Sequence, residues 1–229
     1  MRELVLVSDL HGNAPALERV IDREGLGKEY IVLGDIMGLN SYPEKILELV
    51  RDVATEVIGG NHDKAIFHRG EGHVVSDKLS KFELYHTLSG LSVEQVKWML
   101  ELDYMKTIES GSICLTHAYP WKENASGIEE GNSGIRKREV MEVASNLGGE
   151  YDWLFHGHTH TQYSLDCSKF GHDIHFVNPG TLGYNGHYAV VDIDSEEVEL
   201  KQVDIDIASI KDHISSVLSE SCPSVEEWL

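Results

Sequence analysis

TEVIGGNHD, residues 55–63, is the stretch on which the interpretation of the chain depends. An apolar, β-branched run ends in two glycines, which predicts a buried strand followed by a tight turn. The turn carries an amide oxygen at Asn61 and an imidazole at His62, and neighbouring side chains at the end of a strand point in different directions. Asn61 could therefore face a metal ion while His62 faces a substrate. Asn, His, Asp and Gly are also turn residues, so this stretch by itself favours an ordinary surface turn.

Two strands expected earlier in the chain also end in polar residues. Residues 4–7, LVLV, form a continuous apolar run typical of a strand buried on both faces, and Asp9 and His11 follow it. Residues 30–33 form the next expected strand, which leads into Gly34 and Asp35. All three predicted strands therefore carry candidate functional groups at their C-terminal ends.

Amphipathic helices are expected between these strands. Asn13 is a suitable N-cap for the first helix, and Gly25 or Gly27 ends it, while Pro43 opens the second. The first 63 residues are thus predicted to run strand, helix, strand, helix, strand. Open α/β sheets bind ligands beyond the C-terminal ends of their strands, so the three polar motifs are expected to converge.

The rest of the chain predicts one domain, 1–229, with a helical insertion at about 64–103. After the insertion we expect a hairpin (105–108 and 113–115), a long loop (118–133), a helix (134–147) and a buried strand (151–155). The remainder is expected to be antiparallel, with strands at 161–165, 175–177, 188–193 and 198–203 and a closing C-terminal helix.

Candidate metal ligands recur in this second half. His117 follows the hairpin, and His158 and His160 follow the strand at 151–155, where their alternation on an extended segment predicts a shared face. A set of oxygen and imidazole donors without thiolate suits Mn, Fe, Co or Zn. So many donors suit two ions, and a pair of ions with a bridging carboxylate is built for in-line attack at phosphorus.

The order of the motifs resembles that of the calcineurin-like metallophosphoesterase superfamily. The shared pattern is Asp-x-His at 9–11, Gly-Asp at 34–35, Gly-Asn-His-Asp at 60–63, the lone His117, and Gly-His-x-His at 157–160. The resemblance extends from Leu4 to about Gly183. The turn Asn-Pro-Gly-Thr at 178–181 and the lack of a capping domain are similar to the small bacterial and archaeal phosphodiesterase-like branch.

The resemblance implies an α/β fold of four layers, α-β-β-α, in which helices flank two mixed sheets. It also implies two divalent ions, most simply Mn, with Fe, Zn, Co and Ni as alternatives. The implied ligands are Asp9, His11 and His160 for the first ion, Asn61, His117 and His158 for the second, and Asp35 as the bridge. His62 is implied to protonate the leaving-group oxygen or to stabilise the transition state, while hydroxide formed from a bridging water attacks in line.

Three further residues are expected beside the site. Asp63 is expected to orient His62 or a ligand, because it is adjacent in sequence. Gly180 and Thr181 belong to the turn that lies near the metal site in this family. His156 continues the alternation but is not part of the family pattern, so a buried structural role is expected for it.

The implied activity is hydrolysis of phosphodiester and also monoester bonds in small or nucleotide-like substrates. One alternative is a dinucleoside polyphosphate hydrolase, because Trp121 or Tyr119 could stack on adenine. The other enzyme alternative is a protein phosphatase. The alternative without enzyme activity is a protein-interaction scaffold of the same fold, and His62 and the full ligand set argue against the scaffold. Relatives often carry basic residues after the Asn-Pro-Gly turn, whereas residues 182–187, LGYNGH, offer only a histidine. Phosphate binding would then depend on the ions and on Lys64 or Arg69.

Composition restricts the partners. Of 229 residues, 19 are Lys or Arg and 39 are Asp or Glu, giving a net charge of −20, which repels long nucleic acids and anionic membranes. A small phosphorylated substrate is therefore expected, and a homo-oligomer is left open. A halophilic source and an ordinary acidic protein fit this charge equally. Three cysteines without a CxxC motif and no expected signal peptide predict a reduced, cytoplasmic protein.

Overall fold

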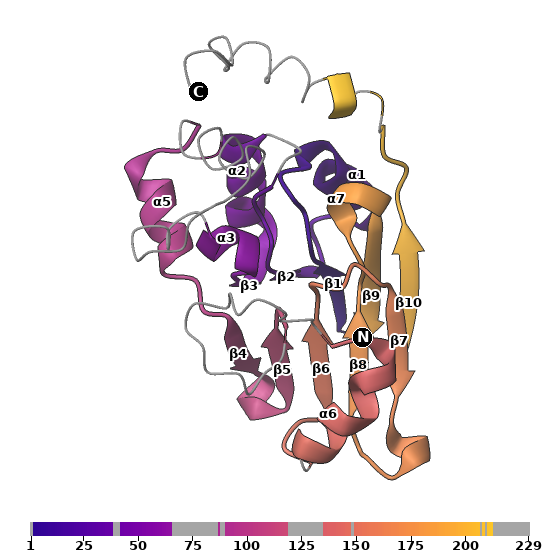
Figure 1. The fold of residues 1–229 in the computed structure, drawn as a ribbon. Helices are drawn as coiled ribbons and strands as arrows, with labels where there is room; N and C mark the ends of the chain where they lie inside the picture. The colour runs from indigo at the N-terminus through magenta and orange to yellow at the C-terminus, as the bar shows by residue number, and fades with distance from the viewer. Residues whose placement is uncertain are drawn as a thin grey trace.

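Two five-stranded mixed sheets stack face to face in the computed structural model of the chain (Figure 1). The structure describes residues 2–38, 42–65, 87, 90–118, 135–147, 149–206, 208 and 210–212. The first sheet has the order β10 (Glu197–Gln202), β9 (His187–Asp192), β1 (Glu3–Val7), β2 (Glu29–Leu33), β3 (Ala54–Ile58). The second has the order β4 (Met105–Ile108), β5 (Ile113–Thr116), β6 (Trp153–His156), β8 (His175–Asn178), β7 (Tyr163–Asp166).

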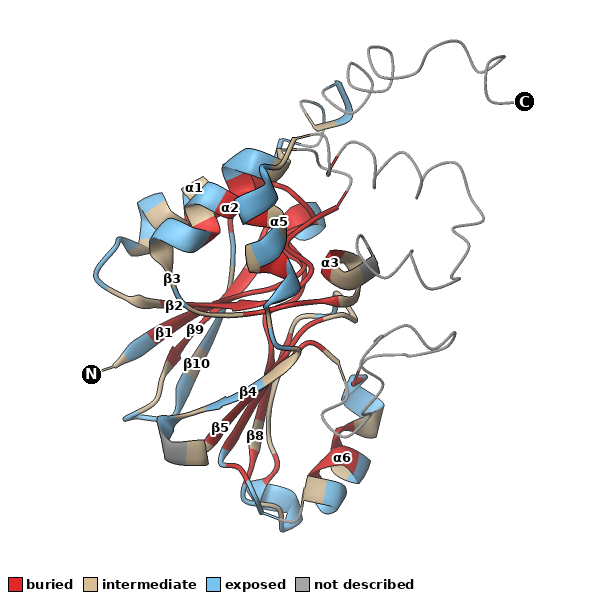
Figure 2. Ribbon diagram, turned by 90° about the vertical axis from the view of Figure 1, so that its left-hand side faces the viewer, coloured by how far each residue is buried: buried red, intermediate tan, exposed pale blue. Residues whose placement is uncertain are grey.

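The four predicted layers are confirmed, and the apolar run that begins the chain is why they form. In β1, Leu4 and Leu6 pack into the core between the sheets, whereas Val5 and Val7 pack beneath the helices on the other face. Alternation on an extended strand sends successive side chains to opposite faces, so a strand that is apolar throughout needs cover on both sides. Figure 2 shows helices over the first sheet and α6 (Val140–Leu147) beside the second.

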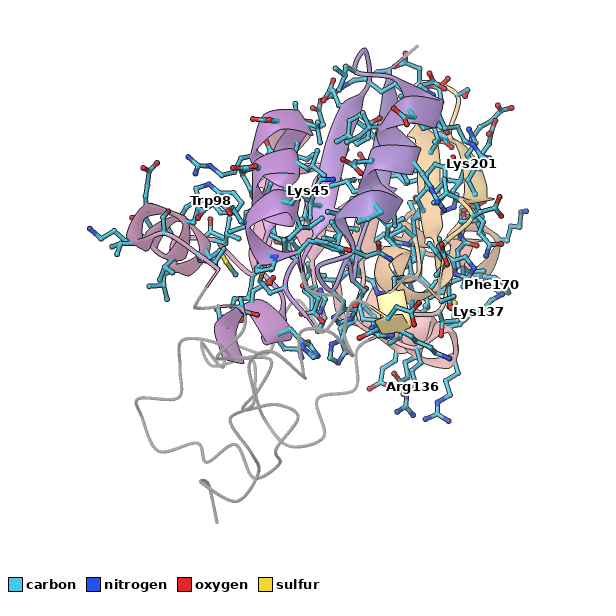
Figure 3. All side chains as sticks on the ribbon, turned by 90° about the horizontal axis from the view of Figure 1, so that it is seen from above. Lys45, Trp98, Arg136, Lys137, Phe170 and Lys201 are labelled. Carbon is cyan, nitrogen blue, oxygen red and sulfur yellow. The ribbon has the colours of Figure 1, made fainter. Side chains whose placement is uncertain are left out.

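The helices over the first sheet are capped as the sequence predicts. The Asn13 side chain accepts a hydrogen bond of 3.1 Å from the Ala16 amide at the start of α1 (Ala14–Glu24), and Gly25 ends that helix. Pro43 opens α2 (Pro43–Val53). The two helices lie side by side over the sheet (Figure 3), and α5 (Val93–Leu100) begins with a capping box between Ser92 and Gln95.

Strand direction differs from the expectation. The chain after residue 160 was expected to be antiparallel, and β7 is antiparallel to β8, but β8 pairs parallel with β6, which itself pairs parallel with β5. In the first sheet, β9 and β10 are antiparallel, as expected. Residue alternation reports which face of a strand is buried and carries no information on its direction, which depends on the crossover through α6.

Several boundaries also differ. The helix predicted at 134–147 begins with a 3-10 turn, η3 (Lys137–Glu139), before α6. The hairpin of β4 and β5 turns through η2 (Glu109–Gly111), and η4 (Ser168–Phe170) joins β7 to β8. Residues 66–86 of the predicted insertion, 119–133 of the predicted loop, and most of the predicted C-terminal helix lie outside the described residues. A single domain for 1–229 therefore stays a prediction.

Within the described ranges, no helix combines the length and the apolar character needed to cross a membrane.

Candidate metal centre

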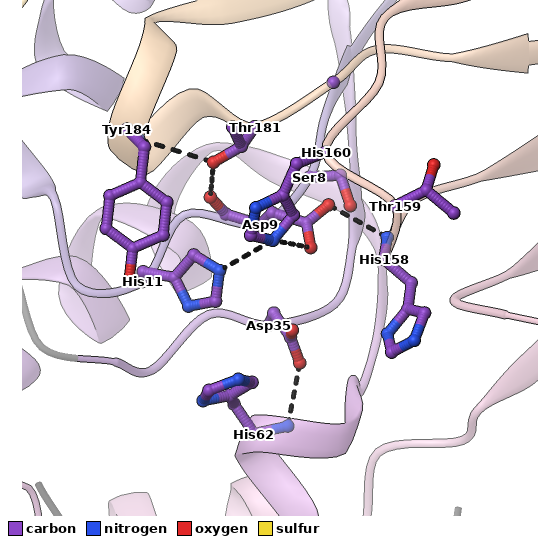
Figure 4. A network of polar contacts seen from close by, with 12 residues as sticks. Ser8, Asp9, His11, Asp35, His62, His158, Thr159, His160, Thr181 and Tyr184 are labelled. Atoms are coloured by element: carbon purple, nitrogen blue, oxygen red, sulfur yellow. Dashed lines mark hydrogen bonds and ion pairs between the residues drawn. The ribbon is translucent and has the colours of Figure 1, made fainter. Parts of the chain in front are cut away.

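The predicted motifs meet at one end of the stacked sheets (Figure 4). The candidate residues lie just after the C-terminal ends of five strands, in the segment that follows each strand. These residues are Asp9 and His11 after β1, Asp35 after β2, Asn61 and His62 after β3, His117 after β5, and His158 and His160 after β6. The structure thus brings all eight candidates together, at the sheet edge where open α/β sheets bind ligands.

Backbone strain is concentrated at these residues. Within the described part of the chain, seven non-glycine residues have a positive φ, and five of them are candidate ligands. The five values are 51° at Asp9, 47° at His11, 50° at Asp35, 68° at His158 and 55° at His160. Left-handed backbone is uncommon for residues other than glycine, and it gathers at functional sites where the surrounding structure enforces it.

Hydrogen bonds between loops enforce this backbone. The Asp9 amide donates to the Gly34 carbonyl at 3.0 Å, and the His11 amide donates to the Asp35 carbonyl at 2.9 Å. The loop after β1 is therefore bound directly to the loop after β2. This contact fixes the two aspartates relative to each other.

His158 and His160 correct one expectation. They do not alternate on an extended segment, because both have left-handed backbone and His158 lies in a bend. As a result the two rings serve different partners: His158 Nδ1 lies 2.7 Å from Asn61 Oδ1, and His160 Nε2 lies 3.1 Å from His11 Nε2. The bend passes so close to β1 that a Cβ at Gly157 would lie 1.9 Å from Ser8 Oγ.

The first donor group consists of Asp9, His11 and His160. His160 Nε2 lies 3.1 Å from Asp9 Oδ1 and 3.1 Å from His11 Nε2. One ligand atom from each residue falls within 4.8 Å of the others. Asp9 and His11 are buried, whereas His160 is partly exposed at the rim.

The second donor group contains Asp35, Asn61, His117 and His158. Asn61 Oδ1 lies 2.7 Å from His158 Nδ1 and 3.2 Å from His117 Nε2, which is itself 3.3 Å from Asp35 Oδ2. His117 Nδ1 contacts the Leu33 carbonyl at 2.6 Å. An N–H donated to that carbonyl leaves the lone pair of Nε2 facing the group, as in metal sites where a backbone oxygen fixes the tautomer.

These donors fit divalent metal ions. Within the described residues, His11 Nδ1 is a buried polar atom without a hydrogen-bond partner, and the buried Asp9 Oδ1 has only the His160 ring nitrogen at 3.1 Å, in an ion-pair contact. His11 Nε2 and His160 Nε2 face each other at 3.1 Å, and Asp9 Oδ1 lies 3.1 Å from the same His160 nitrogen, so three possible ligand atoms converge there. A cation satisfies such converging lone pairs, and nitrogen with carboxylate oxygen is a donor set of Mn, Fe, Co and Zn.

His62 lies against both donor groups. It is the second residue of α3 (Asn61–Ala65), and its backbone amide donates a 2.8 Å hydrogen bond to Asp35 Oδ1. Its ring meets the His11 ring edge-on, with centroids 4.9 Å apart. One ligand atom each from His62, His11 and Asp35 falls within 4.8 Å of the others, so the His62 imidazole reaches the same space as the donors.

Asp63 was expected to orient His62 or a ligand, and the described contacts of its side chain lead to the loop that carries Asp35. Its buried carboxylate accepts hydrogen bonds from the backbone amides of Gly60 at 2.8 Å, Met37 at 2.9 Å and Ile36 at 3.2 Å. It therefore holds the loop that carries Asp35 against the turn before α3. Of the two expected alternatives, these contacts fit the orientation of a ligand, because the Asp63 side chain faces the loop after β2 that carries Asp35.

The turn at 178–181 supports the first loop from the other side. Thr181 Oγ1 donates to the Asp9 carbonyl at 2.9 Å, and it caps α7 (Leu182–Asn185) by accepting from the Tyr184 amide. The Gly180 amide donates to Asn178 Oδ1 at 2.8 Å. His156 has the expected structural role, because it is fully buried and its Nε2 lies 2.6 Å from the Tyr163 hydroxyl.

The protonation states of Asp35 and His11 favour the binding of cations. Burial would raise the pKa of Asp35, but His117 and His62 hold it well below its usual range, so the carboxylate stays ionised. Burial lowers the pKa of His11 to about 4, which leaves its ring neutral. Burial alone would lower the pKa of His117, but Asp35 and Asp9 raise it to about 10. Bound metal ions would lower the pKa of His117 again, because a ligand nitrogen must lose the proton that the carboxylates stabilise on it.

Some contacts were not anticipated from the sequence. Tyr184 stacks on His11, and no motif pointed to it. Lys64, considered for phosphate binding, has its ammonium over the Tyr104 ring, 2.8 Å from the centroid. Arg69, Tyr119 and Trp121 lie outside the described residues.

Comparison with known proteins places the chain among similar folds. The uncharacterised protein MJ0912 of Methanocaldococcus jannaschii is 24% identical over 247 residues, which cover 99% of this chain and 95% of that protein. A metallophosphoesterase from Sphaerobacter thermophilus superposes with a TM-score of 0.75 at 23% identity, covering 97% of this chain and 95% of that one. The hypothetical protein PH1004 from Pyrococcus horikoshii superposes with a TM-score of 0.75 at 20% sequence identity, covering 98% of this chain and 95% of that one. At these identities the two structures establish the fold alone.

The family is established by the sequence itself. The sequence model of the calcineurin-like phosphoesterase superfamily domain matches residues 2–196. That stretch includes every strand of the first sheet except β10, the whole of the second sheet, and all eight residues of the candidate centre. The chain therefore belongs to the calcineurin-like phosphoesterase superfamily.

Proposed function

We propose that this protein is a phosphoesterase that uses two divalent ions to hydrolyse phosphodiester bonds, and also monoesters, in small or nucleotide-like substrates. The observation that carries the proposal is the convergence of two donor groups beside one further imidazole. Asp35 belongs both to the group with His11 and His62 and to the group with His117 and His158. A carboxylate shared in this way is what a pair of neighbouring ions requires.

The ligand roles follow from the two groups. Asp9, His11 and His160 would hold the first ion, and Asn61, His117 and His158 the second, with Asp35 between them. When bound, the ions supply Lewis acidity, a more acidic water and charge to offset phosphate oxygens. Mn²⁺ suits this mixture of imidazole, amide and carboxylate donors, and Fe, Zn, Co and Ni remain alternatives.

His62 supplies the proton in this proposal. Its backbone amide is held by Asp35, so the imidazole is placed by the same carboxylate that joins the donor groups. An imidazole nitrogen at that position would protonate the leaving-group oxygen as the ester bond breaks. General acid catalysis of this kind contributes about 10²–10⁴-fold to the rate.

Net charge supports a small substrate. With a net charge of −20 the chain repels long polyanions, whereas the two ions would make the electrostatic potential inside the site positive. Within the described residues of α7 and its C-cap, 182–186, no basic side chain is present, and the ammonium of Lys64 lies on Tyr104. Phosphate binding in this proposal therefore depends mainly on the ions.

A reconstitution experiment tests the proposal. Protein stripped with a chelator and reloaded with Mn²⁺ would be assayed on bis-p-nitrophenyl phosphate, p-nitrophenyl phosphate and diadenosine tetraphosphate. We expect metal-dependent cleavage of the aryl diester, with weaker cleavage of the monoester. Faster cleavage of the dinucleotide would favour a dinucleoside polyphosphate hydrolase, and cleavage of none of the three would favour an interaction scaffold.

The His62→Gln variant tests the proposed acid. It should bind two Mn²⁺ ions and lose about 10²–10⁴-fold in turnover. His172→Gln is the matched control, because His172 contacts Ser145 on α6, in the outer layer of the second sheet. Wild-type turnover in His62→Gln would reject the catalytic role, and loss of one ion would identify His62 as a ligand instead.

A further inference from the structure

The His11 ring lacks the contact that usually orients a metal-binding histidine. Such a histidine commonly donates its second ring N–H to a carboxylate, a carbonyl or water. His117 has this contact, through Nδ1 and the Leu33 carbonyl. His11 Nδ1, in contrast, is buried and has no hydrogen-bond partner in the described part of the chain. The described polar contact of the ring is at Nε2, with His160 Nε2 at 3.1 Å, and this nitrogen is the one that would bind an ion, so with an ion bound something other than a hydrogen bond must orient the His11 ring.

Among the residues that the structure describes, three rings contact the His11 imidazole, and two of them belong to the candidate centre. His62 and His160 meet it edge-on, with centroids at 4.9 and 5.1 Å. The third is Tyr184, whose ring stacks on His11 at 4.7 Å with an angle of 28° between the planes (Figure 4). A stacked ring restricts rotation of the imidazole about the bond that joins it to the chain, because rotation would drive the imidazole edge into the tyrosine face.

Tyr184 is itself held firmly. The α7 backbone lies directly on the loop after β1: the Leu182 amide donates to the Ser8 carbonyl and the Gly183 amide to the Asp9 carbonyl, both at 3.0 Å. On the other side, Asn13 Nδ2 donates to the Gly183 carbonyl at 2.8 Å. A Cβ at Gly183 would lie 2.4 Å from the Leu10 carbonyl oxygen, so only glycine permits this approach.

We propose that Tyr184 is a positioning residue that holds the His11 imidazole, by ring stacking, in the orientation that directs Nε2 at the first metal ion. The inference rests on the proposed function to the extent that it assumes ions at the two donor groups. Tyr184 is not a ligand in this assignment. Its ring takes the place of the missing hydrogen bond at His11 Nδ1.

Metal binding by the apo protein tests the assignment without any substrate. Mn²⁺ would be titrated calorimetrically into chelator-stripped wild type, Tyr184→Phe and Tyr184→Leu. Phenylalanine keeps the stacked ring, so both ions should bind as in wild type. Leucine removes the aromatic face, and one of the two ions should bind about 10–100-fold more weakly, the range found when outer contacts of metal ligands are lost. The other ion should be unaffected.

Phe170→Ala is the matched control. Phe170 is also an exposed aromatic residue, at 60% against 39% for Tyr184, and it lies in η4 at the periphery of the second sheet (Figure 3). Its removal should leave both affinities unchanged. Thermal unfolding of each variant in chelator would show whether folding is intact.

Three results would overturn the assignment: wild-type affinities in Tyr184→Leu, equal weakening of both ions, or the same loss in Tyr184→Phe as in Tyr184→Leu. A wild-type protein that binds only one ion would overturn it as well. Wild-type protein that binds two ions but cleaves none of the three test substrates would overturn the proposed reaction instead. The two failures are therefore distinguishable.

Discussion

Gly60 is the position at which a single methyl group should disable the centre. An ideal Cβ built there lies 2.1 Å from Asp35 Oδ1 and 2.2 Å from the Asp35 backbone nitrogen. Real Cβ contacts do not fall below 3.0 Å, so in Gly60→Ala the two backbones must separate by roughly 0.8 Å from the 2.2 Å starting point. The Asp35 carboxylate could rotate away, but its backbone nitrogen cannot.

The magnitude follows from what this separation breaks. Overpacking of this kind costs about 1–3 kcal/mol. Hydrogen bonds from the His62 amide to Asp35 Oδ1, at 2.8 Å, and from the Met37 amide to Asp63 Oδ1, at 2.9 Å, cross the same junction. At about 1 kcal/mol each, their loss brings the expected decrease in unfolding free energy to about 3–5 kcal/mol. A displacement near 1 Å in a catalytic centre can lower turnover about 100-fold.

Gly59→Ala is the control within the same motif. A Cβ at Gly59 would meet the Leu102 Cβ at 3.5 Å, which is ordinary van der Waals contact. We expect its unfolding free energy to stay within about 0.5 kcal/mol of wild type. Urea unfolding in chelator would measure stability, and Mn²⁺ titration would measure binding. If Gly60→Ala matches Gly59→Ala in both measurements, the close approach of Gly60 to Asp35 does not support the centre.

Three further predictions concern acid stability, the Asp9 loop and the ions. Burial would raise the pKa of Glu24, but hydrogen bonds from Lys28, Tyr188 and Lys201 lower it to about 2 from its ordinary value of 4.5. Between pH 2 and 4.5 the folded chain then binds fewer protons than the unfolded chain. The unfolding free energy of wild type should therefore fall by up to about 3 kcal/mol from this group as pH falls from 4.5 to 2. In Glu24→Gln the unfolding free energy, measured with urea across the same range, should fall by less. Thr181→Val removes the hydrogen bond to the Asp9 carbonyl and the cap of α7, so urea unfolding should show a loss of about 1–2 kcal/mol. Mn²⁺ at 100 times its dissociation constant should raise the unfolding free energy by about 2.7 kcal/mol over that in chelator, per ion.

Each of these predictions has a contrary result. Parallel pH profiles for wild type and Glu24→Gln would mean that the three hydrogen bonds do not stabilise the ionised form. Wild-type stability in Thr181→Val would mean that the Asp9 loop is held without the threonine hydroxyl. A melting temperature that does not change with Mn²⁺ concentration would mean that the folded centre does not bind the ion.

Sequence patterns predicted those parts of the molecule that depend on near neighbours. The run at 4–7 predicted β1 and its burial on two faces, and Asn13 predicted the start of α1. The candidate ligands were found because each follows the end of a predicted strand, and parallel strands present these ends along one edge. Neither inference needed information on distant contacts.

The features that sequence patterns missed depend on close approaches between segments far apart in the chain. Gly183 lies against Leu10, and Gly60 against Asp35, but nothing in the local sequence distinguishes these glycines from turn glycines. Tyr184 becomes relevant only once α7 is placed on the loop after β1. The left-handed backbone of His158 was missed because alternation of histidines fits an extended strand, and only the contact of Gly157 with Ser8 forces the bend.

The strained backbone bears on the choice between an enzyme and a scaffold of the same fold. Left-handed conformation costs roughly 1–2 kcal/mol for a residue with a side chain, and five candidate ligands adopt it. Their combined strain is comparable to the whole stability of a typical domain, about 5–15 kcal/mol. Glycine would relieve that strain without altering the core, since these loops lie beyond the strand ends. A surface that only bound another protein would gain nothing from keeping aspartate and histidine there, whereas converging donors beside His62 are what a metal-dependent phosphoesterase needs.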